Sequence, residues 1–268
     1  MSNSNTNTST HTIVFGDDGS PSADLAWLWI NSHAWPAWRL EVVRAVTPEV
    51  VKVAEDPAAL REWQPANPRI AFAESCLDDV VQLTIDQDPR VALTRHTDLL
   101  VIGHRGPGVV KAMHIGSTAE WLLVHPPSPM VIARSGRPTR TVMVCHDGSP
   151  SAQLATASLA ALPWSSGLSI EIVCVDDGRV DIDSAIADAQ QQLSGAGATI
   201  FATILVGDPS DQLVKHASHD SPDLVVMGTR GLTGMSRLTI GSTASVVAHA
   251  TNHSVLLACD PGQLPIRR

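Results

Sequence analysis

The sequence predicts an α/β protein of two tandem Rossmann-like domains, each an open parallel sheet flanked by helices. The chain has 268 residues, enough for two domains of ordinary size. Hydrophobic residues make up 44% of it, so both domains can bury a core. Short β-branched segments alternate with helix-like segments, a pattern typical of βαβ units with parallel strands.

An internal repeat supports the division into two copies. The segment Asp18–Ala23 recurs letter for letter at Asp147–Ala152. Later matches keep the same order, which indicates duplication of a whole domain. These are Gly103–Gly106 with Gly228–Gly231, and Ile115–Thr118 with Ile240–Thr243.

The repeat and the composition set the predicted boundaries. Residues 1–11 are polar and form a flexible tail, residues 12–135 form the first domain and residues 140–260 the second. The Gly- and Pro-containing segment Ser135–Thr139 suits a short linker. Residues 261–268 form a C-terminal tail.

In the first copy, the apolar segments predict the following strands. They are Thr12–Phe15, Leu40–Val46, Asp98–Ile102 and Met130–Ala133, with Val80–Ile85 as the weaker candidate for the third strand in sequence. A helix is expected over Ser22–His33. The interval from Asp88 to Asp98 is shorter than its counterpart from Asp208 to Asp223, so the helix here is expected to be truncated.

The second copy shows the same alternation more clearly. Its predicted strands are Thr141–Cys145, Ser169–Val175, Thr199–Val206, Asp223–Met227 and Val255–Cys259. Its predicted helices are Ser151–Leu162, Asp181–Leu193, Ser210–His219 and Ser242–Ala250. The last strand of a copy would be a sheet edge, which we expect to be covered by the other domain or by a second chain.

Composition argues against several classes of protein. The net charge is −9 and neither copy is basic, so we expect no nucleic-acid binding. No apolar segment approaches the ~20 residues of a membrane-spanning helix, and residues 1–11 lack the features of a secretion signal. The four cysteines form no C-x-x-C pair. We therefore expect a cytoplasmic protein with no membrane contact.

Tryptophan is concentrated in the first copy, where we expect a packed core or interface. The six tryptophans there are Trp27, Trp29, Trp35, Trp38, Trp63 and Trp121, and the chain contains seven in all.

An acid follows the first predicted strand of each copy, as Asp18 and Asp147. In an open parallel sheet, ligands bind beyond the carboxyl ends of the strands, where these residues would lie. A carboxylate there can accept hydrogen bonds from a sugar hydroxyl or a base amino group. The alternatives are an Asp-Gly turn, or an N-cap for the helix that follows.

A glycine–serine motif follows the fourth strand of each copy. Glycines let the backbone approach a ligand closely, and a helix N-terminus favours phosphate. The motif residues are Gly103, Gly106, Gly116 and Ser117 in one copy, and Gly228, Gly231, Gly241 and Ser242 in the other. Ser117 with Glu120 also fits a capping box, in which the hydroxyl would only cap the helix.

A basic residue lies between the first two glycines of each motif, as Arg105 and Arg230, and Lys111 and Arg237 follow. These side chains can neutralise phosphate oxygens, although an arginine exposed on a surface loop is the ordinary alternative. Because acid, glycines and arginine recur together and in order, we predict a phosphate-bearing ligand.

This ordering of motifs resembles the universal stress protein family in its tandem two-domain form. The resemblance covers roughly residues 12–135 and 140–260, and implies a five-stranded sheet of order 3-2-1-4-5 in each domain, with bound ATP. It implies adenosine contacts from Asp18 and Asp147, and backbone contacts to adenine from Val46 and Val175. The glycine–serine residues would hold ribose and phosphates.

The first copy departs from this pattern. His104, Pro107 and His114 lie in its loop, and the helix before Asp98 is truncated, so its pocket is expected to be altered. The second copy matches more closely.

The motifs favour a binding protein over an enzyme. The sequence has no G-x-x-x-x-G-K-[ST], G-x-G-x-x-G or G-x-S-x-G string. Our leading hypothesis is an ATP-binding stress-response regulator, with or without Mg²⁺, that acts through conformation or association. Its partner would be a second copy or an unidentified regulatory protein. The alternatives are a slow ATP hydrolase or nucleotidyl-transfer enzyme, and a protein whose first site serves only as an interaction surface.

Overall fold

The computed structural model describes residues 11–45, 77–95, 97–106, 115–232 and 240–258. The first half contains β1 (His11–Gly16), α1 (Pro21–Asn31), β2 (Trp35–Ala45), β3 (Leu77–Ile85), α5 (Pro89–Ala92), β4 (Leu99–Gly103), α6 (Ser117–Val124) and β5 (Met130–Ala133). The second half contains β6 (Thr141–Cys145), α7 (Pro150–Ala160), β7 (Ser169–Asp176), α8 (Ile182–Leu193), β8 (Thr199–Val206), α9 (Pro209–Asp220), β9 (Leu224–Gly228), α10 (Ser242–Ala250) and β10 (Ser254–Ala258).

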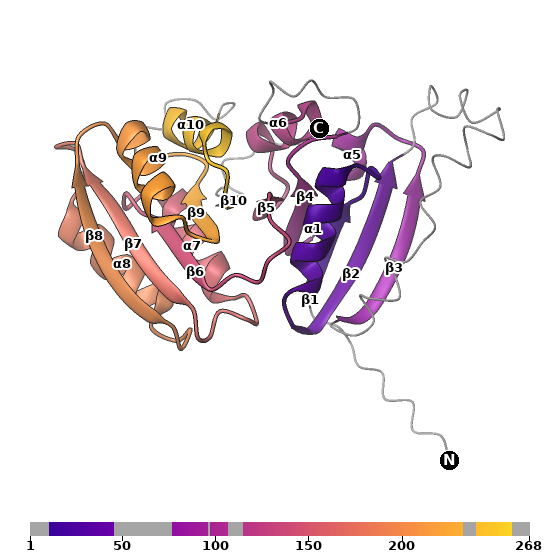
Figure 1. Ribbon diagram of the computed structural model, residues 1–268, viewed down its shortest axis with the longest axis horizontal. Helices are drawn as coiled ribbons and strands as arrows, with labels where there is room; N and C mark the ends of the chain where they lie inside the picture. The colour runs from indigo at the N-terminus through magenta and orange to yellow at the C-terminus, as the bar shows by residue number, and fades with distance from the viewer. Residues whose placement is uncertain (1–10, 46–76, 96, 107–114, 233–239, 259–268) are drawn as a thin grey trace, which may run out of the picture.

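The strands form one ten-stranded sheet of order β3-β2-β1-β4-β5-β10-β9-β6-β7-β8. Within each half the strands are parallel and follow the predicted order 3-2-1-4-5. The halves lie side by side, and β5 pairs antiparallel with β10 between them (Figure 1). Hydrogen bonding between the two halves therefore covers the edges of both last strands, which was one of the two expected solutions.

The predicted elements are confirmed, with differences at their ends. The weak candidate Val80–Ile85 is part of β3. β2 begins at Trp35, well before the predicted Leu40. A register irregularity between Trp35 and Arg39, with Ala37 at φ 63°, interrupts the regular strand there. The sequence pattern therefore marked only the regular part of the strand. The truncated helix is α5, with 4 residues against 12 in α9.

Helices cover both faces of the sheet, and the central strands are buried between them, whereas the edge strand β8 is largely exposed. On one face, α1, α7 and α8 pack against residues such as Ile13, Phe15 and Ile172. On the other, α5, α6, α9 and α10 pack against residues such as Val14 and Val173. Successive strand residues point to opposite faces, which explains why these strands read as continuous apolar segments in the sequence.

Aromatic side chains pack between the two halves. Trp164, which follows α7, lies with its ring centroid 5.7 Å from that of Trp29 and 5.8 Å from that of Trp35. Trp27, Trp29, Trp35 and Trp38 are buried, which confirms the expected core or interface of tryptophans. Trp63 lies outside the described residues.

His33 is part of this aromatic contact and is held neutral. One ring nitrogen, Nε2, accepts a hydrogen bond of 3.0 Å from the N–H of Thr139, so Nδ1 carries the proton and donates to the carbonyl of Trp29 at 2.7 Å. Burial lowers the pKa of His33 from 6.5 to about 4.

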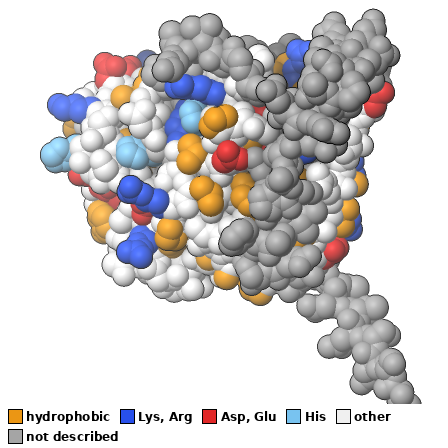
Figure 2. Space-filling view, turned by 45° about the vertical axis from the view of Figure 1, so that its right-hand side comes forward, with side chains coloured by type: hydrophobic (Ala, Val, Ile, Leu, Met, Phe, Trp, Pro, Cys, Tyr) orange, Lys and Arg blue, Asp and Glu red, His pale blue; other side chains and the backbone are white. Residues whose placement is uncertain are grey.

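In the described part of the chain, no helix is both long and apolar enough to cross a membrane. On the face that Figure 2 displays, Lys and Arg side chains are interspersed with acidic, histidine and hydrophobic ones. The expectation that the chain binds no nucleic acid stays a prediction.

Acidification is expected to destabilise the fold through His33. Between the unfolded pKa of 6.5 and the folded pKa of about 4, the unfolded chain binds the additional proton, so stability falls as the pH falls through that window. From pH 7 to pH 5 this group should contribute a loss of about 2 kcal/mol. Urea denaturation at both pH values should therefore show a steeper loss for the wild type than for His33→Gln. Equal pH dependence in the two proteins would contradict this role.

Candidate functional site

The second half contains a pocket of about 450 Å³ beyond the carboxyl ends of β6, β7 and β9. The first turns of α9 and α10 also line it, so helix N-termini open toward its interior. Every described site residue predicted for the second half lines this pocket. These residues are Asp147, Val175, Gly228, Arg230, Gly231, Gly241 and Ser242.

Asp147 is held by the turn that connects β6 to α7. Its Oδ1 accepts the N–H of Ser149 at 3.0 Å, so the interpretation as an Asp-Gly turn is confirmed. The N-cap alternative is wrong, because Ser149 caps α7 through its own hydroxyl, which accepts the N–H of Ala152 at 3.2 Å. The other oxygen, Oδ2, faces Gly231, where an added Cβ would lie 2.9 Å away. Gly231 therefore lets the loop approach this carboxylate closely.

Gly228 is required by packing within the protein. A Cβ at this position would lie 2.6 Å from backbone atoms of Ser151 and Ala152 in the first turn of α7. An added Cβ on Gly103 would likewise lie 2.5 Å from the backbone of Ser22 in α1. The first glycine of each motif thus lets a strand end pass close to a helix, independently of any ligand.

The end of the motif opens α10 toward the pocket. Gly241 occupies the N-cap position without a side-chain cap, and its N–H donates to the carbonyl of Thr229 at 2.7 Å. Ser242 is the first residue of the helix, so its hydroxyl is not used as an N-cap. Helix amides without an intrahelical partner at this end favour an anionic ligand.

Arg230 is 6% exposed and lines the pocket, so the interpretation as an exposed surface arginine is wrong for this residue. Its carbonyl accepts the hydroxyl of Ser149 at 3.1 Å, which ties the glycine loop to the start of α7. The loop backbone is therefore held in place before any ligand binds.

The structure adds pocket residues that the motifs did not single out as site candidates. His146 precedes the predicted acid, and burial lowers its pKa although Asp147 opposes the shift. Burial also raises the pKa of the Cys145 thiol. Asp177, Arg179 and Asp208 line the pocket from loops after β7 and β8. The position of Asp208 before Pro209 was a signal for a helix start, but only the parallel sheet brings it to the pocket.

The first half repeats part of this geometry. An added Cβ on Gly106 would lie 3.0 Å from Oδ2 of Asp18, and one on Gly116 would lie 3.2 Å from the backbone nitrogen of Gly106. The hydroxyl of Ser20 donates to the carbonyl of Arg105 at 3.0 Å. Ser20 also caps α1, so Asp18 is not an N-cap. Burial raises the pKa of Asp18.

The first half also differs from the second. Asp17 forms an ion pair of 2.5 Å with Arg44, and its side chain is fully buried, whereas His146 follows the corresponding strand in the second half. The capping-box interpretation of Ser117 is wrong, because α6 begins at Ser117 itself and Gly116 is its N-cap, with no side-chain cap. Several predicted residues lie outside the described ranges, namely Val46, Pro107, Lys111, His114 and Arg237.

Comparisons with known proteins agree with this architecture. A model of the universal stress protein family matches residues 180–258. Over 289 residues, the chain is 27% identical to universal stress protein Rv2623 of Mycobacterium tuberculosis, covering 92% of this chain and 95% of that protein. It is 31% identical over 165 residues to a universal stress protein of Synechocystis sp., covering 59% of this chain and 57% of that protein. A crystal structure of a universal stress protein from Archaeoglobus fulgidus has the same fold, with a TM-score of 0.67 and 18% identity over 92% of this chain and 98% of that one.

The packing requirement at Gly228 can be tested by stability. Gly228→Ala is expected to lower the free energy of unfolding by about 1–3 kcal/mol, since the new Cβ must displace backbone atoms of α7. Gly195→Ala is the matched control, because a Cβ there meets no atom within 4 Å, and its effect should stay within about 0.5 kcal/mol. Chemical denaturation of both variants measures this difference, and similar stability in the two would refute the explanation.

Proposed function

Because the chain belongs to the universal stress protein family, with two family domains in tandem, we propose that it is an ATP-binding stress-response regulator. Its principal ATP site is the pocket of the second half. Binding changes the conformation or association of the protein, and thereby a surface that a regulatory protein or a second copy of the chain recognises.

One observation carries this proposal. In the second half, the acid, glycine, arginine and serine residues of the repeated motifs line one pocket. It lies at the position where open parallel sheets bind ligands. In the proposed complex, Oδ2 of Asp147 accepts from the adenosine part and the backbone of Val175 contacts adenine. The amides at the start of α10, with the hydroxyl of Ser242, bind phosphate oxygens.

The charges that line the pocket suit ATP together with Mg²⁺. Arg230 and Arg179 are cationic and favour phosphate. Asp177 and Asp208 supply carboxylate oxygens, the ligand type that Mg²⁺ prefers when it also binds phosphates. The residues present therefore fit a magnesium nucleotide.

A contact between the halves suggests how binding is transmitted. α10 begins at the pocket and carries His249 in its last turn, where Nε2 lies 2.7 Å from a carboxylate oxygen of Glu120 on α6. α6 begins at Ser117, after its N-cap Gly116, in the corresponding motif of the first half. A shift of α10 on phosphate binding would thus reach the first site. The similar approach of Gly106 to Asp18 supports a second, altered nucleotide site there.

Asp147→Ala is expected to weaken ATP binding at least about tenfold, because a hydrogen bond that involves a charged group is lost. Isothermal titration calorimetry of the full chain with ATP and Mg²⁺ measures the affinity and the number of sites. Asp183→Ala removes the same charge from an exposed position on α8 and is expected to leave the affinity unchanged. The ATP affinity of Asp18→Ala, measured in the same way, tests whether the first half binds nucleotide.

Two results would overturn this function. The first is a wild-type chain that takes up no adenine nucleotide, and the second is equal affinity in Asp147→Ala and Asp183→Ala. The enzymatic alternative is tested separately, by measuring phosphate release from ATP with Mg²⁺. Turnover that is lost in Asp147→Ala would favour the slow hydrolase.

A further inference from the structure

A second cluster of polar side chains lies in the second half, away from the pocket. It comprises Glu171 near the start of β7, and His216 and Asp220 near the end of α9. The first turn of α9 lines the pocket, and a helix of 12 residues is about 18 Å long. The cluster therefore lies near the opposite end of this helix.

The three side chains converge on one point. Nε2 of His216 lies 2.9 Å from Oε1 of Glu171 and 2.9 Å from Oδ2 of Asp220. The three candidate ligand atoms all lie within 4.8 Å of one another. The side chains of His216 and Glu171 are 15% and 14% exposed, and that of Asp220 is 42% exposed. The cluster is therefore partly shielded but open to solvent on the side of Asp220.

Two carboxylate oxygens meet one histidine nitrogen here. Nε2 of His216 can carry at most one proton to donate, yet two carboxylate oxygens lie at equal distance from that atom. Within the described ranges, neither carboxylate forms an ion pair with a lysine or arginine. Glu171 also accepts the hydroxyl of Thr203 at 2.6 Å, and His219 lies 4.0 Å from Asp220. The partly shielded Glu171 and the more exposed Asp220 thus share Nε2 of His216.

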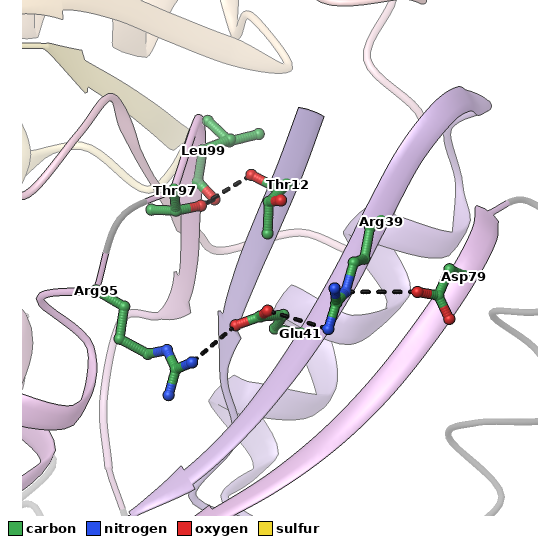
Figure 3. Close-up of polar contacts among 7 residues, drawn as sticks. All are labelled: Thr12, Arg39, Glu41, Asp79, Arg95, Thr97 and Leu99. Carbon is green, nitrogen blue, oxygen red and sulfur yellow. Dashed lines mark hydrogen bonds and ion pairs between the residues drawn. The ribbon is translucent and has the colours of Figure 1, made fainter. Parts of the chain in front are cut away.

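The first half has a carboxylate at the equivalent position but neutralises it differently (Figure 3). Glu41 pairs with Val14 across β1 and β2, as Glu171 pairs with Met143 across β6 and β7. Glu41 forms ion pairs with Arg39 of the same strand at 3.3 Å and with Arg95, in the loop between α5 and β4, at 3.4 Å.

Neither arginine is retained around Glu171. Ser169 stands where the first half has Arg39. Arg39 is paired with Thr12 across β1 and β2, and Ser169 is paired with the equivalent Thr141 across β6 and β7. The longer helix α9 brings His216 and Asp220 to this side instead. One half therefore surrounds its glutamate with fixed cations, and the other with groups that ligate metals.

We propose that Glu171, His216 and Asp220 bind a divalent transition-metal ion, with zinc the best match. One imidazole nitrogen and two carboxylate oxygens are ligands that zinc accepts, and a water completes a tetrahedral site on the exposed side. Around zinc such ligand atoms lie roughly 3.3 Å apart, so small side-chain movements suffice. Any proton on Nε2 leaves when the metal binds, and the ion joins α9 to β7.

Zinc titration of the full chain tests this site. The protein is treated with EDTA, exchanged into buffer without nucleotide, and titrated with Zn²⁺ by calorimetry and with Co²⁺ by visible absorption. We expect one ion per chain at this site, and a loss of affinity of at least about tenfold in His216→Ala and in Asp220→Asn. Zn²⁺ should also raise the melting temperature of the wild type but not of these variants.

The design includes a matched control and a check on folding. Glu41→Gln changes the equivalent carboxylate of the first half and is expected to leave Zn²⁺ affinity unchanged, whereas Glu171→Gln lowers it. Asp220 is the most exposed ligand, so Asp220→Asn should fold even if a variant at Glu171 does not; circular dichroism verifies this. Absence of binding below about 100 µM Zn²⁺, or equal affinity in the wild type and Asp220→Asn, would leave only a histidine in contact with two acids and overturn the proposal. Neither result depends on ATP binding.

Discussion

The parallel pairing of β6 with β7 on one side and with β9 on the other is the constraint on which the candidate site depends. Parallel strands end at the same edge, and chain connections that leave in opposite directions create a crevice there. Asp147, the glycine loop and the start of α10 are distant in sequence but adjacent at this edge. The close approach of Gly231 to Asp147 then holds the loop against the turn after β6.

Duplication of this unit has a second consequence, because each copy ends in a strand with an open edge. Antiparallel pairing of β5 with β10 covers both edges and joins the halves into one sheet. Trp29, Trp35 and Trp164 fill the space between the halves on one face. On the other face, Arg134 donates to the carbonyls of Ala248 and His253 near the end of α10. The pocket of the second half and the corresponding motif of the first therefore belong to one continuous structure.

The halves have diverged where their polar groups meet the sheet. The first has the buried pair of Asp17 with Arg44, and arginines around Glu41. The second has His146 after its first strand, and His216 with Asp220 around Glu171. Histidine can release its proton and ligate a metal, whereas arginine stays charged and cannot. At these equivalent positions the first half thus presents arginines, and the second half presents histidines that can ligate a metal.

The sequence by itself determined the duplication, the strand and helix alternation and the motif residues around the pocket, because local apolar patterns and repeated segments are properties of neighbouring residues. It left open whether Asp147 caps a helix, whether Arg230 is exposed and what covers β5. It also gave no indication that Glu171 meets His216. Only the tertiary structure decided these points, because each depends on contacts between segments far apart in the chain, set by strand order and by the packing of helices on the sheet.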